Sequence, residues 1–400
     1  MEERVHKIGF IHGDFPFGGA ERVTLDIAEY LKGKGYKVYV FTTVYHEAKM
    51  PAGTENLVEI VHLPEKNVVR SAEDADLICS YIKECGIDVI VAVAKRLKHI
   101  GKIRNTGCKV VYAHHNMPFH EAQAYIDRAW RKGRRNPLRY LEWLLISYPK
   151  YILFGMAHKK EENFYRESYM ESDRYVMLVK EYGDAIVRRL GLDPSNNKVR
   201  VVGNSERVPH DVNFNKKKII LYVGRLSYAD KRIDRLLKAW KLVQEDMPDW
   251  TVKIVGEGKE RKSLEKMADR LDLQRVCFMG FTNNVRQYYN EASVLALVST
   301  YEGFPLCITE AQANGVIPVV FDSFAAAETM AGPSGVNGFL VKSFDIKAFA
   351  SALKKIASMP KEEITAMRQN VVKKAREEYS PEKIGEEWKK LFDELIYEEE

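Results

Sequence analysis

Two glutamates near the end of the chain have the type and spacing of a ligand-binding site. They bound the segment Glu302-Gly303-Phe304-Pro305-Leu306-Cys307-Ile308-Thr309-Glu310, which follows an apolar run, 292–299, typical of a buried strand. Pro305 suits the first position of a helix, so we expect Glu302 in a strand-to-helix loop and Glu310 about one turn into the helix. The backbone N–H groups of a helix start attract anions, whereas carboxylates attract hydroxyl groups. The combination predicts a nucleotide-sugar ligand; the alternative is a charged loop before an exposed helical glutamate.

Two basic residues occupy a comparable place earlier in the chain. Arg225 and Lys231 follow the apolar segment 218–223 and precede a helical segment, 232–247. We therefore expect Arg225 at a strand end and Lys231 at the start of the helix. A departing diphosphate carries about two negative charges, which two fixed cations would neutralise. Arginine and lysine are common on any surface, so the prediction depends on their placement at a strand end.

Glycines mark three further loops. Gly18 and Gly19 follow the first strand segment, 7–11, and allow a backbone to approach a phosphate or sugar; a tight turn is the alternative. Gly256 belongs to half of a dinucleotide fingerprint whose third glycine is replaced by Arg261, which argues against NAD-dependent hydride transfer. Gly280, after the next strand, is expected near a nucleobase.

A pair of histidines and an Asp-x-Asp motif complete the candidate residues. His114 and His115 follow the strand segment 109–113, and His115 is the preferred contact to the transferred sugar or acceptor. Ordinary loop histidines are the alternative. Asp74 and Asp76 lie in a helical segment, where we expect both to face solvent. The sequence therefore predicts no metal site.

The segment 128–139 is strongly basic. It carries six basic residues and no acidic one, among aromatic and aliphatic neighbours: Arg128, Arg131, Lys132, Arg134, Arg135 and Arg139. Such a cluster is attracted to an anionic membrane surface by about 1 kcal/mol per charge. Gly133 and Pro137 interrupt any single long helix, so we expect a loop with helical flanks. A solvated basic loop is the alternative to membrane attraction. No nucleic-acid motif accompanies the cluster, so nucleic acid is not an expected partner.

Length and periodicity predict the architecture. The chain has 400 residues, 46% hydrophobic and 30% charged, which is enough for two soluble domains. Apolar segments alternate with helical ones in both halves, which predicts two Rossmann-like, doubly wound α/β domains facing a cleft. We place the domains at 1–204 and 218–380, with a linker at 205–217 and a last helix, 381–400, packing back on the first domain.

Two observations bear on location. The first residues lack the features of a signal peptide, and the longest apolar runs fall far short of the ~20 residues that span a bilayer. The five cysteines form no CxxC pair, which is typical of reduced thiols in a cytosolic protein. We expect a cytoplasmic protein, and its expected locations include the periphery of the membrane at its inner face.

The order of these motifs resembles the GT4-type family of retaining glycosyltransferases, which have the two-domain GT-B fold. The similar motifs are Gly18-Gly19-Ala20-Glu21-Arg22, Gly224-Arg225-Leu226 with Lys231, Gly256-x-Gly258, and Glu302-Gly303-Phe304-Pro305 with Glu310. The resemblance is close over 219–353 and patchy before 204. It implies a UDP- or GDP-sugar donor bound mainly by the second domain, an acceptor bound mainly by the first, and no required metal.

The resemblance also implies roles for single residues. Arg225 and Lys231 correspond to the pair that grips the donor diphosphate, and Glu302 to the residue that holds the sugar hydroxyls. The amides of Gly303, Phe304, Pro305 and Leu306 lie beside the sugar in that scheme, except that Pro305 has no N–H. Glu310 corresponds to the ribose ligand, Gly19 to the glycine that lets the first domain close over the phosphates, and His115 to a histidine at the sugar.

The predicted activity is transfer of a hexose-type sugar, with retained anomeric configuration, to a hydroxyl group of a saccharide or lipid-linked acceptor. Synthesis of cell-envelope polysaccharide is the expected context. A sugar-nucleotide epimerase of the same fold and a non-catalytic donor-binding scaffold are the alternatives.

Overall fold

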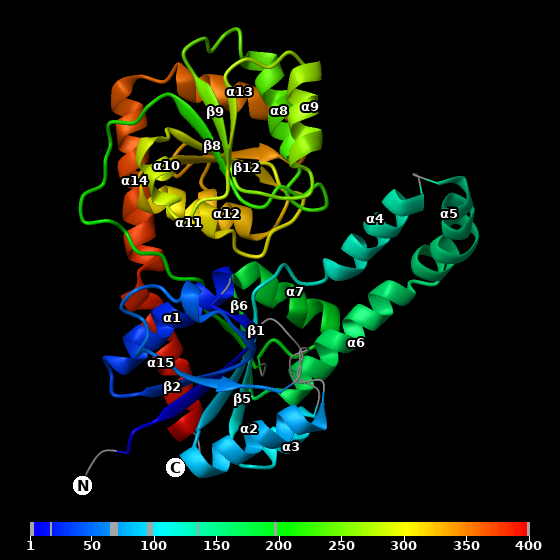
Figure 1. Ribbon diagram of the computed structural model, residues 1–400, viewed down its shortest axis with the longest axis vertical. Coiled ribbons are helices and arrows are strands. Elements are labelled where there is room, and N and C mark those ends of the chain that lie inside the picture. Colours follow the sequence, from blue (N-terminus) through cyan, green and yellow to red (C-terminus); the bar gives the residue numbers. More distant parts are fainter. Residues whose placement is uncertain are drawn as a thin grey trace. The chain divides into compact units, whose positions relative to one another are not determined.

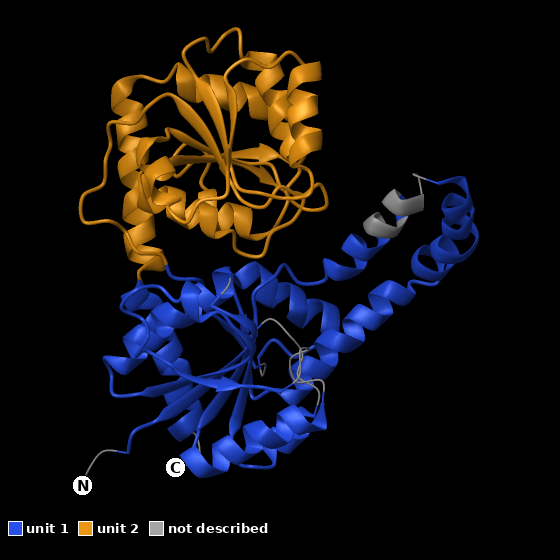
Figure 2. Cartoon of the chain, viewed as in Figure 1, with its two compact units in different colours: residues 1–205, 381–400 blue, residues 206–380 orange. Residues whose placement is uncertain are grey.

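The computed structural model describes residues 4–16, 18–64, 71–93, 99–133, 136–195 and 198–397. The chain divides into two compact units (Figure 2). Unit 1 comprises residues 1–205 and 381–400, and unit 2 comprises residues 206–380. We predicted a linker at 205–217; residue 205 belongs to unit 1 and residues 206–217 belong to unit 2.

Unit 1 is built on a seven-stranded parallel sheet with the order β3-β2-β1-β4-β5-β6-β7 (Figure 1). Its strands are β1 (Lys7–Phe15), β2 (Lys37–Tyr45), β3 (Glu59–His62), β4 (Val89–Val93), β5 (Lys109–His114), β6 (Arg174–Met177) and β7 (Val199–Val201). All five residues of β4 are buried, as expected for a parallel strand covered on both faces. The strand order reverses between β1 and β4, which pair in parallel. Ligands of such sheets bind beyond the carboxyl ends of the strands at this point.

Helices cover the sheet of unit 1. They are α1 (Gly19–Lys32), η1 (Glu47–Lys49), α2 (Ala72–Cys85), α3 (Ile100–Arg104), α7 (Lys180–Leu190) and α15 (Pro381–Tyr397). The last helix buries Trp388 and Phe392 against Phe10 of β1, with ring centroids 6.3 and 6.4 Å apart. A methyl group on Gly385 would lie 2.2 Å from the ring of Tyr30, so α15 packs closely on α1.

Our expectation that both aspartates of the Asp-x-Asp motif face solvent was wrong for Asp74. The Ser71 hydroxyl caps α2 by accepting the Asp74 N–H at 3.0 Å, and Asp74 lies on the same face as the buried Ile78. Asp74 is therefore fully buried, whereas Asp76 is exposed and pairs with Lys102 at 2.7 Å. The two carboxylates point in different directions along the helix.

A helical arm extends from unit 1 between β5 and β6 (Figure 1). Its elements are α4 (Glu121–Gly133), α5 (Pro137–Glu142), the π-helical turns η2 (Trp143–Ser147) and η3 (Pro149–Leu153), and α6 (Met156–Glu171). The predicted interruption of the helix is confirmed, because α4 ends at Gly133 and α5 begins at Pro137. The predicted basic segment lies here, but Arg134 and Arg135 and the side chains of Arg128, Arg131 and Lys132 lie outside the described part of the structure.

Unit 2 has a six-stranded parallel sheet with the order β10-β9-β8-β11-β12-β13. The strands are β8 (Ile219–Val223), β9 (Thr251–Val255), β10 (Val276–Gly280), β11 (Val294–Leu297), β12 (Ile317–Asp322) and β13 (Phe339–Lys342). The helices are α8 (Ile233–Val243), α9 (Arg261–Arg270), α10 (Arg286–Glu291), α11 (Leu306–Ala313), α12 (Ala326–Ala331), α13 (Ile346–Ala357) and α14 (Lys361–Tyr379). Trp240 of α8 and Phe349 of α13 are fully buried in its core. The predicted fold class, two doubly wound parallel α/β domains, is confirmed.

Candidate functional site

The candidate site in unit 2 forms where the strand order reverses. β8 and β11 are neighbours, with Ile220 paired to Val294, so the loops after these two strands lie side by side. The backbone N–H of Thr300 donates to the carbonyl oxygen of Asp230 at 2.7 Å and joins the two loops. The residues predicted from the two loops are therefore brought to one edge of the sheet.

Lys231 and Glu302 form an ion pair across these loops. Lys231 Nζ lies 2.5 Å from Glu302 Oε1, and the Ser299 hydroxyl donates to the same oxygen at 2.7 Å. Both side chains are largely buried, with 19% and 10% of their surfaces exposed. Burial lowers the pKa of Lys231, but the neighbouring Glu302, Cys307 and Asp230 together raise it by more, so the pKa is raised overall. Lys231 is therefore a fixed cation with a defined position.

Arg225, at the start of the loop that contains Lys231, is held by an ion pair in which it remains largely exposed. Its guanidinium donates to Asp230 at 3.0 Å while 71% of the side chain stays exposed. The buried Tyr222 hydroxyl donates to the Arg225 carbonyl at 3.1 Å and fixes the backbone there. Burial acts to raise the pKa of Asp230, but the Ser227 hydroxyl and the Lys231 and Arg225 cations lower it overall.

The helix after this loop is shorter than predicted. We expected a helix over 232–247 with Lys231 at its start, but α8 spans Ile233–Val243. Arg232 adopts a left-handed conformation, with φ 50°, so the helix can begin only after it. Lys231 therefore lies in the loop, where its side chain reaches Glu302.

Glu310 lies one turn into α11, as its spacing predicts, and is held by a buried tyrosine. The Tyr289 hydroxyl, from α10, donates to Glu310 Oε2 at 2.8 Å, and Tyr289 is only 1% exposed. We predicted Pro305 as the first residue of the helix, and this was wrong. Its extended ψ of 106° makes it the cap, and the helix begins at Leu306. Gly303 and Phe304 complete the loop before that cap.

Cys307 lies among these charged groups. Lys231, Glu302 and Glu310 all act on its pKa electrostatically, which places the three side chains around one thiol. Burial raises the pKa of Cys307 to about 12, so the thiol is neutral at physiological pH. Cys307 thus lies beside the site as a small neutral group.

The glycines of unit 2 let neighbouring strand-end loops pack together. Gly256 has φ 134°, and a methyl group there would lie 2.0 Å from the Gly224 carbonyl oxygen. A methyl group on Gly258 would lie 2.2 Å from the Leu226 carbonyl oxygen. Gly256 N–H also donates to the carbonyl of Gly280 at 2.8 Å. Gly256 and Gly258 are therefore explained by packing, whether or not they contact a ligand.

In unit 1, the first strand-end loop surrounds a buried histidine that the sequence analysis did not single out. His12 Nε2 lies 2.9 Å from the Thr24 hydroxyl, and its Nδ1 lies 3.6 Å from Glu21 Oε1. Gly18 has φ 136° and would place a methyl group 2.5 Å from Glu21, so a side chain there would displace this carboxylate. Gly19 is the first residue of α1.

The two adjacent histidines after β5 have different surroundings. His114 is 2% exposed, and its Nε2 lies 3.0 Å from the Tyr165 hydroxyl. His115 is half-buried, and burial together with His12 lowers its pKa to about 4. His115 is therefore a neutral imidazole beside the His12–Glu21 pair, whereas His114 belongs to the interior.

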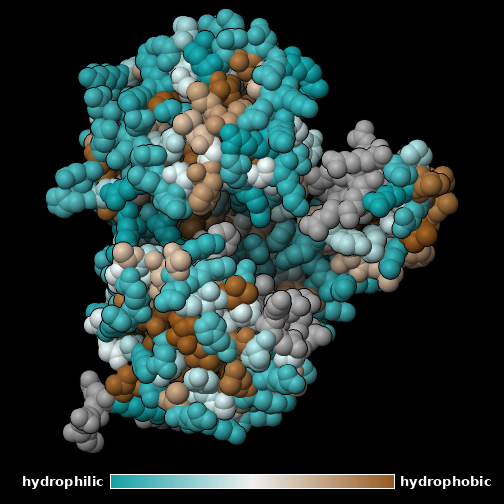
Figure 3. Space-filling view, viewed as in Figure 1, coloured by the Kyte–Doolittle hydropathy of each residue, from teal (hydrophilic) through white to brown (hydrophobic). Residues whose placement is uncertain are grey.

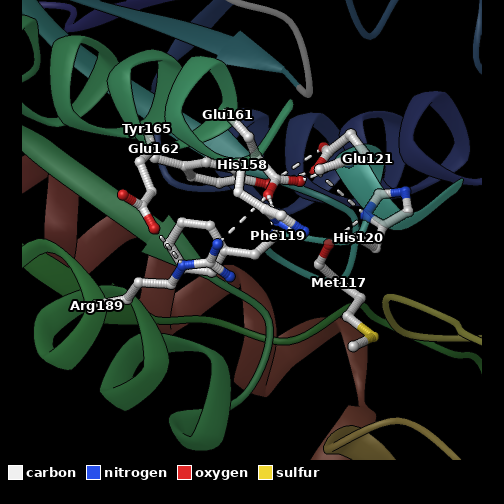
Figure 4. A network of polar contacts seen from close by, with 10 residues as sticks. Met117, Phe119, His120, Glu121, His158, Glu161, Glu162, Tyr165 and Arg189 are labelled. Atoms are coloured by element: carbon white, nitrogen blue, oxygen red, sulfur yellow. Dashed lines mark hydrogen bonds and ion pairs between the residues drawn. The ribbon is translucent and has the colours of Figure 1, made fainter. Parts of the chain in front are cut away.

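A network of polar side chains that includes Tyr165 lies at the base of the arm (Figure 4), and His114 contacts it through the Tyr165 hydroxyl. The Tyr165 hydroxyl lies 3.2 and 3.1 Å from the two Glu121 oxygens. Glu161 is 7% exposed, and its Oε1 accepts the N–H of Ala122 at 2.9 Å. Burial and the neighbouring Glu121 carboxylate raise the pKa of Glu161 against the opposing effects of that N–H and of Arg189.

This network predicts a pH-dependent stability that Glu161→Gln removes. The folded-state pKa of Glu161 is raised, so ionisation costs the folded protein free energy as pH rises above the unfolded value near 4.5. Glutamine cannot ionise, so the melting temperature of Glu161→Gln relative to wild type should increase from pH 4.5 to 8. Each kcal/mol corresponds to about 2–4 °C for a domain of this size. The neighbouring Glu162→Gln is the control, because Glu162 is partly exposed and pairs with Arg189 at 2.9 Å. Parallel pH profiles for wild type and Glu161→Gln would contradict the assignment.

Several of these partners have no signal in a single sequence. Tyr289 and Glu310 are 21 residues apart, and Tyr165 is 51 residues from His114. Asp230 and Ser299 each precede a predicted site residue closely, and His12 directly precedes a predicted glycine loop, so these three could have been found at strand ends. Among the described residues, no group of three or more His, Cys, Asp or Glu side chains has the geometry of a metal site.

Comparisons with known proteins give two family matches and several relatives. Residues 204–378 match the model "Glycosyl transferases group 1", and residues 17–205 match "Glycosyltransferase Family 4". An uncharacterised glycosyltransferase of Haemophilus influenzae is 35% identical over 178 residues, which cover 44% of this chain and 49% of the relative. The chain thus spans about half the length of that relative, and 56% of an amylovoran biosynthesis glycosyltransferase of Erwinia amylovora.

Two other similarities extend over nearly the whole chain. An α-1,4-N-acetyl-D-galactosaminyltransferase of Campylobacter jejuni, named for a diphosphoundecaprenol-linked saccharide, is 24% identical over 398 residues, 97% of this chain and 99% of the relative. The crystal structure of Anabaena Alr3699/HepE in complex with UDP-glucose has a TM-score of 0.70 and 18% identity, covering 96% of this chain and 99% of that one. At this level of identity, the structural similarity shows a shared fold.

Proposed function

Because this chain belongs to the GT4-type glycosyltransferase family with the GT-B fold, we propose that it moves a hexose-type sugar from a nucleotide-sugar to a hydroxyl group, with retained anomeric configuration. The observation that carries the proposal is the Lys231–Glu302 pair at the point of unit 2 where the strand order reverses. A buried cation and a buried carboxylate that lie side by side can bind two different parts of one ligand. The cation suits an anionic diphosphate, and the carboxylate suits a neutral, hydroxyl-rich sugar.

The donor is assigned to unit 2 residue by residue. Lys231 and the exposed Arg225 bind the diphosphate, assisted by backbone N–H groups at the start of α11. Glu302 accepts hydrogen bonds from sugar hydroxyls, and Glu310, one turn further, binds the ribose. The loops of Gly256 and Gly280 flank the nucleoside in this scheme.

The pairing of each cation with a carboxylate changes how the diphosphate is recognised. Lys231 is already neutralised by Glu302, and Arg225 is in contact with Asp230, so the four groups together carry no net charge. A bound diphosphate must therefore share these cations with their carboxylates. Stabilisation is then strongest when negative charge on the diphosphate grows, as the bond to the sugar breaks. This arrangement favours the transition state over the bound donor.

The reaction follows from this electrostatics. The bond between the anomeric carbon and the diphosphate oxygen breaks, and the electron pair leaves with the diphosphate. The acceptor oxygen forms a bond to the anomeric carbon from the face that the diphosphate vacates, which retains configuration. A diphosphate oxygen takes the proton of the acceptor hydroxyl. Lys231 keeps its charge throughout, because its pKa is raised.

Unit 1 is assigned to the acceptor and to the reacting end of the donor. Gly18 and Gly19 are proposed to approach the phosphates, and His115 to contact the transferred sugar. The lowered pKa of His115, to about 4, makes it a neutral hydrogen-bonding group at physiological pH. The name of the Campylobacter relative includes an undecaprenol-linked saccharide, which supports a saccharide or lipid-linked acceptor. Cell-envelope polysaccharide synthesis is the proposed context, with the segment 128–139 near an anionic membrane.

A panel of UDP- and GDP-hexoses, incubated with saccharide and polyprenol-linked acceptors, tests the function. The expected result is transfer from one donor class, with the donor's anomeric configuration present in the NMR spectrum of the product. Conversion of the donor in the absence of any acceptor would instead identify an epimerase. Donor binding by calorimetry without turnover on the whole panel would favour a binding scaffold.

Glu310→Ala should weaken ground-state binding of the nucleotide. A hydrogen bond to a charged group contributes about 1.5–3 kcal/mol, so the Kd for the nucleoside diphosphate should rise about tenfold or more. The KM for the donor should rise by a similar factor with little change in kcat, because the ribose takes no part in the bond change. Calorimetry and initial rates measure the two effects, with the exposed Glu245→Ala as the matched control. An unchanged Kd would remove Glu310 from the site.

A further inference from the structure

We propose that the end of the helical arm, residues 138–156, inserts into the interface of an anionic lipid bilayer. This arm tip belongs to unit 1, whereas the donor site belongs to unit 2, and the proposal goes beyond the transfer reaction. It rests on three observations: an unusual exposure of large apolar side chains, the way they are distributed around the helices, and the charge of the flanking segments.

The arm tip exposes large apolar side chains that soluble proteins normally bury. Exposed fractions of its residues include 78% for Leu138, 67% for Leu145, 62% for Ile146, 67% for Leu153 and 66% for Phe154. The space-filling view shows apolar residues gathered at the outer end of the arm (Figure 3). Isolated exposed apolar residues need no explanation, but a contiguous group of this kind marks an interaction surface.

The exposed side chains spread over more than one face of the arm tip instead of forming one narrow stripe. Leu144, Leu145 and Ile146 are consecutive and all exposed, and so are Ile152, Leu153 and Phe154. Consecutive residues on a helical turn of about four residues point on the order of 90° apart, so three of them span about half of the circumference. A protein partner covers one face of a helix, whereas an apolar medium surrounds it. The distribution therefore favours a lipid environment.

The charge of the arm favours an anionic surface. Nine basic residues and one acidic residue, Glu142, lie between positions 128 and 160. This net charge of +8 exceeds the +6 of the whole chain, so the remainder of the chain is slightly acidic. The side chains that the structure describes, Arg139, Lys150, Lys159 and Lys160, are all exposed. Two such arms would repel each other, which disfavours a second copy of the chain as the occupant.

Aromatic contacts join the two sides of the arm, so the exposed aliphatic residues belong to a packed element. Trp130 and Trp143 lie with ring centroids 4.6 Å apart, and Trp143 also packs against Tyr148 at 5.2 Å. Nearer the base, the Tyr125 and Tyr151 hydroxyls are 3.0 Å apart. The aromatic seam joins the two sides of the arm and presents the aliphatic residues outward. Basic flanks, interfacial aromatics and an aliphatic end are the composition of an element that lies in the membrane interface.

No helix among the described residues is long and apolar enough to cross a bilayer. The arm tip is made of short pieces, α5, η2 and η3, and Pro149 is the first residue of the second π-helical turn. The proposed insertion is therefore shallow, with aliphatic side chains at the level of the upper acyl chains and basic side chains at the headgroups.

Flotation with vesicles of known composition tests the proposal. The full chain should float with phosphatidylcholine vesicles that contain about one third phosphatidylglycerol, and poorly with phosphatidylcholine alone. Leu145→Ser/Phe154→Ser should reduce the partition coefficient at least tenfold, because two exposed apolar side chains are lost. Lys159→Gln/Lys160→Gln should reduce it about fivefold for each charge. Met170→Ser/Leu242→Ser, which alters equally exposed apolar residues elsewhere (62% and 52%), should leave it unchanged.

Tryptophan fluorescence distinguishes insertion from adsorption. Trp240, Trp250 and Trp388 are buried, so vesicles should shift and quench mainly the signal of the arm, and Trp143→Phe should diminish the change. Lipids brominated in the upper acyl chain should quench this signal. Undiminished flotation of Leu145→Ser/Phe154→Ser would overturn the proposal. The proposal would also be overturned, in favour of a second copy of the chain, by two results together. Wild type would sediment as a dimer that the Leu145→Ser/Phe154→Ser variant dissociates, and wild type would not float with vesicles.

Discussion

Lys231→Ala should lower kcat at saturating donor by about a hundredfold and leave the melting temperature of the protein within a few degrees of wild type. A loss of one fixed cation that stabilises a departing diphosphate commonly costs ~3 kcal/mol of transition-state stabilisation, which corresponds to this factor. The pKa of Lys231 is raised above its ordinary value, so the ratio of wild-type to variant rate should stay constant between pH 6 and 9. Steady-state kinetics with the donor identified from the panel measure both quantities.

The fold of the site should survive this substitution. Two contacts that do not involve the lysine hold its surroundings: the Thr300 N–H bond to the Asp230 carbonyl at 2.7 Å and the Ser299 bond to Glu302 at 2.7 Å. The side chain of Lys231 is already partly solvent-accessible, so Glu302 can gain water in its place. Thermal melting without ligand checks this expectation.

Lys238→Ala is the matched control for Lys231→Ala. Lys238 also pairs with a carboxylate, Asp234, at 3.4 Å, but it lies on the outer part of α8 with 46% of its side chain exposed. Its removal should leave kcat unchanged. Because Lys231 and Glu302 act through one contact, the double variant Lys231→Ala/Glu302→Ala should lose less activity than the product of the single losses. Near-normal turnover by Lys231→Ala would remove the lysine from the reaction.

The strands and the candidate site were predictable to different degrees. The predicted segments Val89–Val93 and Thr251–Val255 match their strands fully. The first is apolar and buried on both faces, and in the second Val252, Ile254 and Val255 are buried. The ends of helices were predicted less well. The left-handed conformation of Arg232 and the extended conformation of Pro305 each delayed a helix by one residue, and neither depends on hydrophobic periodicity.

Only part of the candidate site could be predicted from the sequence. The parallel topology brings strand ends to one edge, so Lys231 and Glu302, 71 residues apart, could be assigned to the same place. Their pairing into a neutral unit could not be predicted, because it depends on side-chain directions in two loops. The buried Asp74 shows the same limit: an Asp-x-Asp pattern gives the spacing of the residues along α2, but not which of them the fold turns inward.

Gly256→Ala should destabilise unit 2 by about 4 kcal/mol, whether or not the residue contacts the donor. A left-handed backbone for a non-glycine residue costs roughly 1–3 kcal/mol, and overpacking adds about as much. Here the added methyl group would lie 2.0 Å from the backbone oxygen of Gly224, which no side-chain rotation can relieve. The loops after β8 and β9 would have to separate. The backbone that positions Arg225, which belongs to the loop after β8, would then shift as well.

Gly335→Ala separates the two contributions to this loss. Gly335, also in unit 2, has φ 87° and open space where the methyl group would be, so it tests backbone strain without a collision. We expect a loss of about 1–2 kcal/mol there, and the difference between the two variants in urea unfolding measures the packing of the loops. Gly256→Ala and Gly335→Ala could instead lose the same free energy of unfolding while Gly256→Ala fails to bind nucleotide. In that case contact with the donor, and not the packing of the loops, would be the reason for glycine at position 256.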